Sequence, residues 1–199
     1  MTDPQKFYGK YRGVVASVLD PERRGRILAQ VPAVYKDGIS GWAEPCLPLT
    51  GINSGLLALP QIGSPIWMEF EQGDPERPIW CGGFWQTGMA PSAIAPLQTL
   101  LQTAGGNSIL LDDTPGVGGI TLTTLTGDTL QLSPATGALL QTALGDKLEI
   151  GPTGITLQTA SGNKLMITAA NIELATALGA SIQLAAAVVT INKDGLMVT

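Results

Sequence analysis

An internal repeat in the second half of the chain constrains its fold more than any other feature. The segment Gly127-Asp128-Thr129-Leu130-Gln131-Leu132 returns in related form at Gly145, Gly162 and Gly179, at intervals of 18, 17 and 17 residues. A second turn-forming residue stands eight positions before each of these four glycines: Gly119, Gly137, Gly154 and Asn171. A fixed period of this size is typical of repeat folds, in which each unit buries its apolar side against neighbours.

Each repeat contains two short segments in which apolar and polar residues alternate. In one of them, Ile155 and Leu157 alternate with Thr156 and Gln158. This period of two predicts β-strands and excludes an amphipathic helix, whose apolar residues recur three and four positions apart. We expect the apolar residues of these strands to form a buried core: Leu130, Leu132, Leu148, Ile150, Ile155, Leu157, Leu165, Ile167, Ile172, Leu174, Ile182, Leu184, Val189 and Ile191.

A single ribbon of this kind cannot bury its own apolar residues. It contains no aromatic residue, and strands separated by only 7 to 10 residues supply at most one face per turn. Three chains wound together would supply three faces and close a triangular β-prism. The sequence therefore predicts a homotrimer held by an intertwined trimeric β-helix, with about eleven strands stacked ~4.8 Å apart.

The first half of the chain is a different kind of polypeptide. All ten aromatic residues lie between Phe7 and Trp85, whereas 17 of the 20 threonines follow residue 96. The sequence has no histidine, which excludes a Ser-His-Asp triad and a histidine-ligated metal site. The net charge of −5 argues against a general nucleic-acid-binding protein, which would have a basic surface.

Short strand patterns separated by proline and glycine fill residues 7–85. Residues 11–19 and 26–34 have strand patterns on either side of a turn, and residues 66–71 alternate strictly. Residues 42–63 are too rich in proline and glycine to be regular. About five short strands in this length predict a Greek-key barrel of the OB type. The chain is thus expected to be all-β, with three parts: a barrel domain at residues 1–85, a linker at 86–96 and the repeat domain at 97–199.

Several short motifs resemble spike proteins of contractile injection systems. In the first half they include Tyr11-Arg12-Gly13-Val14-Val15, Gly41-Trp42-Ala43-Glu44-Pro45 and Gly73-Asp74-Pro75-Glu76-Arg77-Pro78. The segment Gly106-Asn107-Ser108-Ile109-Leu110 is similar to the start of the β-helical needle in these spikes. The family comprises the central spikes of contractile phages, the valine-glycine-repeat spikes of type VI secretion, and the spikes of extracellular phage-like particles, which the chain resembles most.

The resemblance implies a structural role with no enzymatic activity, no cofactor and no bound nucleic acid. Such a spike is made in the cytoplasm and assembled into the baseplate of a phage tail-like particle, where its OB barrel docks on the hub protein. Its needle punctures the target envelope on sheath contraction and contacts the target membrane only on firing. The short linker leaves no room for the cell-wall-lysing domain of some phage spikes. The sequence leaves open whether the particle is a phage or a dedicated injection system.

The last four residues predict a further contact. Leu196, Met197, Val198 and Thr199 provide no polar cap, although repeat arrays usually need one. An exposed apolar end commonly marks a binding surface. The resemblance implies that a conical tip protein of the proline-alanine-alanine-arginine repeat kind binds these residues.

Five acidic or amide positions are candidates for chemistry. The adjacent carboxylates Asp112 and Asp113 precede Thr114-Pro115-Gly116, so a turn stabilised by an Asx bond is expected there instead of a catalytic pair. Asp128, Asp146 and Asn163 follow turn glycines and are expected to stabilise the turns. The sequence leaves open whether an ion binds weakly on the needle axis.

The main alternative is an OB module that binds nucleic acid or a glycan and uses the β-prism only to trimerise. The basic cluster Arg23-Arg24-Gly25-Arg26 lies beside Asp20 and Glu22, which favours a solvated hairpin tip over a phosphate clamp. A receptor-binding fibre is a weaker alternative, because the needle has few aromatic or charged residues with which to recognise a sugar.

Two features bear on the environment of the protein. Cys46 and Cys81 are too few for a disulfide scaffold and are expected to be buried free thiols. The uncharged run at residues 174–192 alternates apolar with small or polar residues, a pattern that is unsuited to a membrane-spanning segment.

Overall fold

The computed structural model describes residues 5–91, 95–192 and, as backbone only, 196–198. The chain divides into two compact units, Met1–Pro91 and Ser92–Thr199. Strands dominate both units, and the helices among the described residues are one short α-helix and one 3-10 turn. The all-β class predicted from the sequence is confirmed.

The first unit contains a closed barrel. Its five strands are β1 Tyr11–Ser17, β2 Leu28–Gln30, β3 Glu44–Pro45, β6 Pro65–Phe70 and β7 Pro78–Gly83. They pair in the order β2-β1-β6-β7-β3, with β3 parallel to β7 and the other pairs antiparallel. A bridge between Ile27 and Ala43 joins the two edges of this sheet. The closure agrees with the predicted OB barrel.

The strict alternation of residues 66–71 produces one buried face. Ile66 and Met68 are fully buried and Phe70 nearly so, whereas Glu69 between them is half-buried. Trp80 of β7 packs in the same core, and its indole Nε1 donates a hydrogen bond of 3.0 Å to the carbonyl oxygen of Gly25. The core of the barrel is thus mainly aliphatic, with Phe70 and Trp80 as its buried aromatic residues.

The chain departs from the predicted pattern after β2. The strand ends at Gln30, and residues Pro32–Tyr35 form the helix α1 where a strand was expected to continue to Val34. Pro32 has no backbone N–H for a strand ladder, and its fixed φ suits the first turn of a helix. Within the irregular residues 42–63, β4 Thr50–Gly51 and β5 Ser54–Gly55 form a small hairpin.

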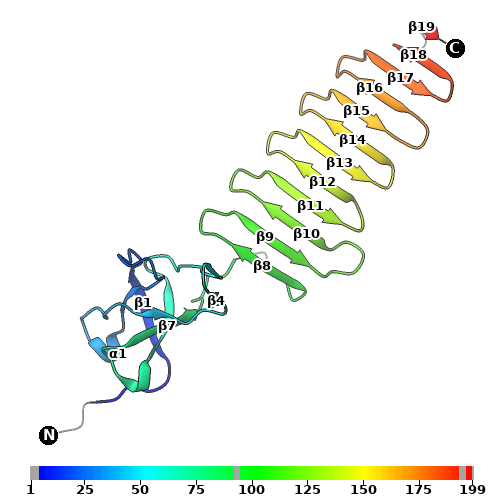
Figure 1. Ribbon diagram of the computed structural model, residues 1–199. Helices are drawn as coiled ribbons and strands as arrows, with labels where there is room; N and C mark the ends of the chain where they lie inside the picture. Colours follow the sequence, from blue (N-terminus) through cyan, green and yellow to red (C-terminus); the bar gives the residue numbers. More distant parts are fainter. Residues whose placement is uncertain (1–4, 92–94, 193–195, 199) are drawn as a thin grey trace. The chain divides into compact units, whose positions relative to one another are not determined.

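The second unit is one antiparallel sheet of twelve strands in chain order, here called the repeat sheet (Figure 1). The strands are β8 Gln98–Gln102, β9 Ser108–Asp112, β10 Gly119–Thr123, β11 Thr129–Ser133, β12 Gly137–Gln141, β13 Lys147–Gly151, β14 Gly154–Gln158, β15 Lys164–Ile167, β16 Ile172–Ala175, β17 Ser181–Ala185, β18 Val188–Ile191 and β19 Leu196–Val198. Each strand pairs with the strands before and after it in the same chain. The sequence predicts three chains wound together. The pairing adds that each chain builds a continuous sheet of its own.

The turn residues of the repeat have the backbone conformations that their positions require. Gly145 and Gly162 have φ of 99° and 91° in five-residue turns at one edge of the sheet. At the opposite edge, Gly154 begins β14 with φ of 136°. A Cβ atom at Gly154 would overlap the carbonyl oxygen of Ile167 in the next strand. Close strand pairing therefore demands glycine at this position.

Replacing Gly154 by alanine tests this requirement. We expect Gly154→Ala to lower the unfolding temperature of the repeat sheet, because strain of this kind costs about 1–3 kcal/mol. Gly105→Ala is the matched control, since a Cβ atom there meets nothing within 4 Å. Thermal unfolding followed by circular dichroism gives the comparison, and equal unfolding temperatures for the two variants would contradict the assigned role.

Candidate functional site

The strand register gathers the apolar residues of the repeat on one face of the sheet, in two rows across the strands. In one row, Leu148 lies opposite Leu157, which in turn lies opposite Leu165. In the other row, Ile150 lies opposite Ile155. All 14 residues that the sequence predicted for the core occupy these rows. We call this side of the repeat sheet the apolar face.

Sequence reasoning missed the beginning of both rows and one leucine, Leu140, within them. The rows also contain Leu101, Ile109, Leu111, Ile120, Leu122 and Leu140. Adjacent apolar pairs, such as Leu110-Leu111 and Leu139-Leu140, hide which residue belongs to which face. The repeat itself holds the missing signal, because Leu140 stands eight positions before Leu148, in the place that Leu157 takes before Leu165.

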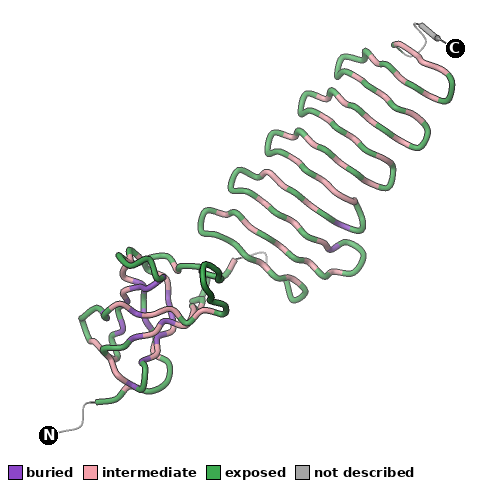
Figure 2. Tube along the Cα trace, in the orientation of Figure 1, coloured by how far each residue is buried: buried purple, intermediate pink, exposed green. Residues whose placement is uncertain are grey.

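The apolar face is uncovered within the chain. The exposed fractions of its predicted core residues from Leu130 to Leu184 range from 36% to 55%. Figure 2 shows these exposed positions alternating with intermediate ones along most strands of the repeat sheet, whereas buried residues concentrate in the first unit. A soluble protein rarely presents so long an apolar surface unless another molecule covers it.

A hollow lies on the apolar face near the first strands of the repeat sheet. It has a volume of about 430 Å³ and is lined by Leu101, Ile109, Leu122, Leu130 and Leu140, together with residues of the neighbouring turns. Its floor consists almost entirely of carbon atoms, so it suits an apolar side chain better than a polar ligand.

The opposite face of the repeat sheet carries mainly polar and charged residues, together with Leu100, Leu110, Leu139 and Met166. Lys147 forms an ion pair of 3.0 Å with Glu149, two residues along β13. Lys164 pairs at 3.4 Å with Glu173 on the next strand. Partly exposed pairs of this kind contribute little stability. They do mark this face as the one that is compatible with water.

A ladder of hydrogen bonds joins the five-residue turns at one edge of the repeat sheet. The side-chain Oδ1 atom of one turn accepts a hydrogen bond from a backbone N–H of the next turn, at 2.8 to 3.0 Å. The four bonds run from Leu125 to Asn107, Ala143 to Asp128, Ala160 to Asp146, and Ala177 to Asn163. This turn ladder fixes each repeat to the one after it.

The turn ladder confirms the structural interpretation of the acidic repeat residues. Asp128 also accepts hydrogen bonds from the hydroxyl groups of Thr126 and Thr124. The Thr126 hydroxyl and the Ala143 amide hold the pKa of Asp128 below its ordinary value. At the other edge, Asp112 accepts a hydrogen bond of 2.9 Å from the backbone N–H of Thr114, which is the expected turn.

The basic cluster of the barrel is neutralised by neighbouring carboxylates. The Arg26 Nη2 atom lies 2.7 Å from Oδ1 of Asp20, and both side chains are nearly buried. Arg24 pairs with Glu44 at 2.8 Å and with Glu22 at 3.2 Å. The hydrogen bonds from Arg26 also hold the pKa of Asp20 well below its usual range. Two of the three arginines are therefore committed to internal ion pairs, which argues against a phosphate clamp.

The cysteines are free, but the prediction that both are buried is wrong. Cys46 is exposed and Cys81 is intermediate. Strand alternation explains both positions, because the preceding inward residues are Ala43 and Trp80, which are buried. Burial nevertheless raises the pKa of the Cys81 thiol.

Among residues 5–91 and 95–192, no three acidic or cysteine side chains come together in a group able to hold a metal ion. The helices in the described part of the chain are all too short or too polar to cross a membrane.

The predicted tip residues are described only in part. Leu196 pairs with Ile191, and Met197 with Thr190, as β19 extends the repeat sheet by one strand. The side chains of Leu196, Met197 and Val198, and the whole of Thr199, lie outside the described residues.

The two units match two family models in the same order. Residues 11–85 match the type VI secretion system/phage-baseplate injector OB domain. Residues 98–137 and 137–197 match the phage baseplate V C-terminal trimerisation domain. The chain belongs to the baseplate spike family. No curated protein matches the sequence.

Membership of the baseplate spike family gives the two units their roles. The barrel is an injector OB domain, and the apolar face belongs to a trimerisation domain, which supports the predicted homotrimer. The protein has a structural role in the baseplate or spike of a phage tail-like particle.

The pH dependence of the spike's stability tests the turn ladder. Because the pKa of Asp128 is lowered in the folded chain, its stabilising effect is present above the unfolded pKa of about 3.9 and is lost as pH falls through the folded pKa. We expect Asp128→Ala to lower the unfolding temperature at pH 7 by several degrees and to weaken its decline in acid.

Asp128→Asn is the control, since its side-chain oxygen can still accept the Ala143 hydrogen bond. It should stay close to wild type at pH 7 and show the same weakened decline in acid, since Asp20 and Asp112, whose pKa values are also lowered, still titrate. Unfolding temperatures at pH 7 and pH 2.5 give the result. Identical pH profiles for the wild type and both variants would show that Asp128 contributes nothing.

Proposed function

We propose that this chain is the central spike of a contractile injection particle, acting mechanically and without catalysis. Three copies of the repeat sheet would form the three sides of a needle, with their apolar faces turned toward the common axis. The barrels would seat this needle on the hub at the end of the inner tube. Sheath contraction would then drive the needle through the target envelope.

The uncovered apolar face carries this proposal. One chain supplies a complete twelve-stranded sheet with apolar rows on one side and charged residues on the other. Three such sheets can cover one another only by enclosing the apolar rows in a triangular prism. Their polar sides then face water, which matches the distribution of the Lys147–Glu149 and Lys164–Glu173 pairs.

The proposed mechanism depends on stiffness. In the repeat sheet, backbone hydrogen bonds connect every strand to the next, and the turn ladder adds side-chain bonds between repeats. Bending such a needle requires many of these bonds to stretch together. In the part of the chain that the structure describes, no three acidic or cysteine side chains form a group able to hold a metal ion, and the proposal requires no metal.

A charge placed on the apolar face tests the arrangement of the trimer. We expect Leu157→Asp to prevent assembly, because three unpaired carboxylates would be buried near one axis, at several kcal/mol per ion. Thr156→Asp is the matched control on the opposite face of the same strand. Sedimentation should give three times 20.6 kDa for the wild type and for Thr156→Asp, and a single-chain mass or aggregates for Leu157→Asp. A trimer of the Leu157→Asp chain would contradict the proposal.

The end of the needle is proposed to bind a conical tip protein. Residues 196–199 continue an apolar repeat and contain no charge. We expect deletion of these four residues to abolish co-purification with the tip protein of the same particle, while the shortened chains still form a trimer. Undiminished co-purification would remove the tip from the proposal.

A further inference from the structure

The loop between β3 and β6 exposes an unusual number of aliphatic side chains. The exposed fractions of six residues between positions 49 and 62 range from 45% to 96%: Leu49, Ile52, Leu56, Leu57, Leu59 and Ile62. They belong to the OB unit and lie far along the chain from the apolar face of the repeat sheet. Neither the barrel core nor the trimerisation domain accounts for them.

One of these residues forms a protruding knob. Ile52 stands at the tip of the β4–β5 hairpin, where Thr50 pairs with Gly55 and Gly51 with Ser54. Its exposed fraction is 96%, so it has almost no contact within its own chain. A backbone hydrogen bond of 3.0 Å from Leu56 to Leu49 continues the hairpin. Two-residue hairpin tips are usually polar, so an exposed isoleucine there calls for a partner.

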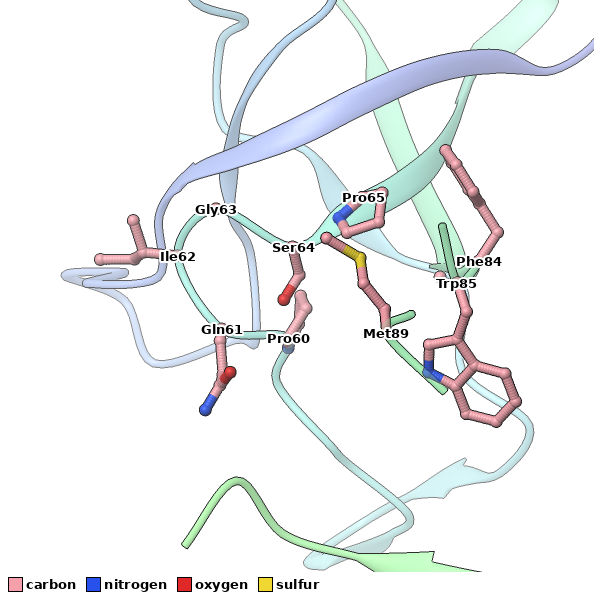
Figure 3. A pocket seen from close by; sticks show the side chains of 10 residues that line it. Pro60, Gln61, Ile62, Gly63, Ser64, Pro65, Phe84, Trp85 and Met89 are labelled. Carbon is pink, nitrogen blue, oxygen red and sulfur yellow. The ribbon is translucent and has the colours of Figure 1, made fainter. Parts of the chain in front are cut away.

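The same unit contains a hollow that suits such a knob. A cavity of about 720 Å³ is bounded by residues 60–65 on one side and by Phe84, Trp85 and Met89 on the other (Figure 3). Trp85 and Met89 are about half exposed or more, at 64% and 48%. The segment 60–64, which precedes β6, is held by a hydrogen bond of 2.8 Å from the Gly63 N–H to the carbonyl oxygen of Val15. This bond fixes one wall of the hollow, whose lining combines apolar side chains with polar atoms.

Threefold symmetry allows the knob of one copy to meet the hollow of the next copy. In a cyclic trimer each copy presents one surface to the copy ahead and a different surface to the copy behind. Eight residues separate Met89 from Gln98, the first residue of the repeat sheet. Fully extended, they span at most about 30 Å. Trimerisation through residues 98–197 thus tethers three OB units at high effective concentration.

We infer that the OB units form a closed ring in which Ile52 of one copy inserts into the Trp85–Met89 hollow of the next. This contact rests on the trimer proposed above and adds a second interface to it. In the ring, the loop that connects β3 to β6 lies at the interface of two subunits, so its apolar side chains are removed from water. The surface is thereby assigned to a second copy of this chain, in preference to the hub protein.

Disulfide trapping in the full-length chain tests the ring. Ile52→Cys is combined with Met89→Cys in a chain in which Cys46 and Cys81 are replaced by serine, and the trimer is exposed to a mild oxidant. Head-to-tail contacts predict a covalent trimer on a denaturing gel without reductant. A second pair, Ile52→Cys with Trp85→Cys, probes the other wall of the hollow. Leu19→Cys with Met89→Cys is the control, since Leu19 is 81% exposed on a different loop.

The outcomes separate the ring from the needle. A covalent trimer from either hollow pair, and not from the control pair, supports the ring. Monomeric bands from both pairs, with a native mass of three chains, would refute the ring and leave this surface to the hub. Dimers from Ile52→Cys alone would also refute it, because they require two knobs to meet. A native mass of one chain would overturn the needle trimer itself.

Discussion

The apolar face of the repeat sheet determines the rest of the architecture. A single antiparallel layer of strands has two faces, and in this chain one of them consists almost entirely of leucine, isoleucine and valine, with Thr99 and Ala138 as exceptions. Within the second unit, no other described segment covers it. Burial of apolar surface is the main force that favours folding, so the sheet is stable only when other molecules supply the missing layer. Three copies of the same chain supply it symmetrically.

The turns connect the successive hairpins of the repeat sheet to one another. Each backbone pairing joins adjacent strands, but the turn ladder joins one repeat to the following repeat through Asn107, Asp128, Asp146 and Asn163. The series ends where Ala180 occupies the equivalent position, since alanine has no acceptor. The turn ladder therefore links all five turns of this edge between residues 103 and 180.

The sequence predicted the repeat sheet well because its signal is local. Period-two alternation and glycines 17 or 18 residues apart identify strands, turns and the apolar face without further information. The turn ladder was not predictable, because its bonds connect side chains and amides 14 to 18 residues apart. Helix α1 was missed because a proline after a strand pattern permits either a turn or a helix. The exposure of Cys46 depends on which face of a two-residue strand points outward, and proline and glycine obscure that register.

The orientation of the apolar face is the claim on which the proposed spike depends. Thiol labelling measures it directly in an otherwise cysteine-free trimer that carries either Leu157→Cys or Thr156→Cys. The two positions are adjacent on β14 and lie on opposite faces. A prism with its apolar rows inside predicts rapid labelling at position 156 and labelling slower by orders of magnitude at position 157. Equally rapid labelling at both positions, in a chain that sediments as a trimer, would contradict the account.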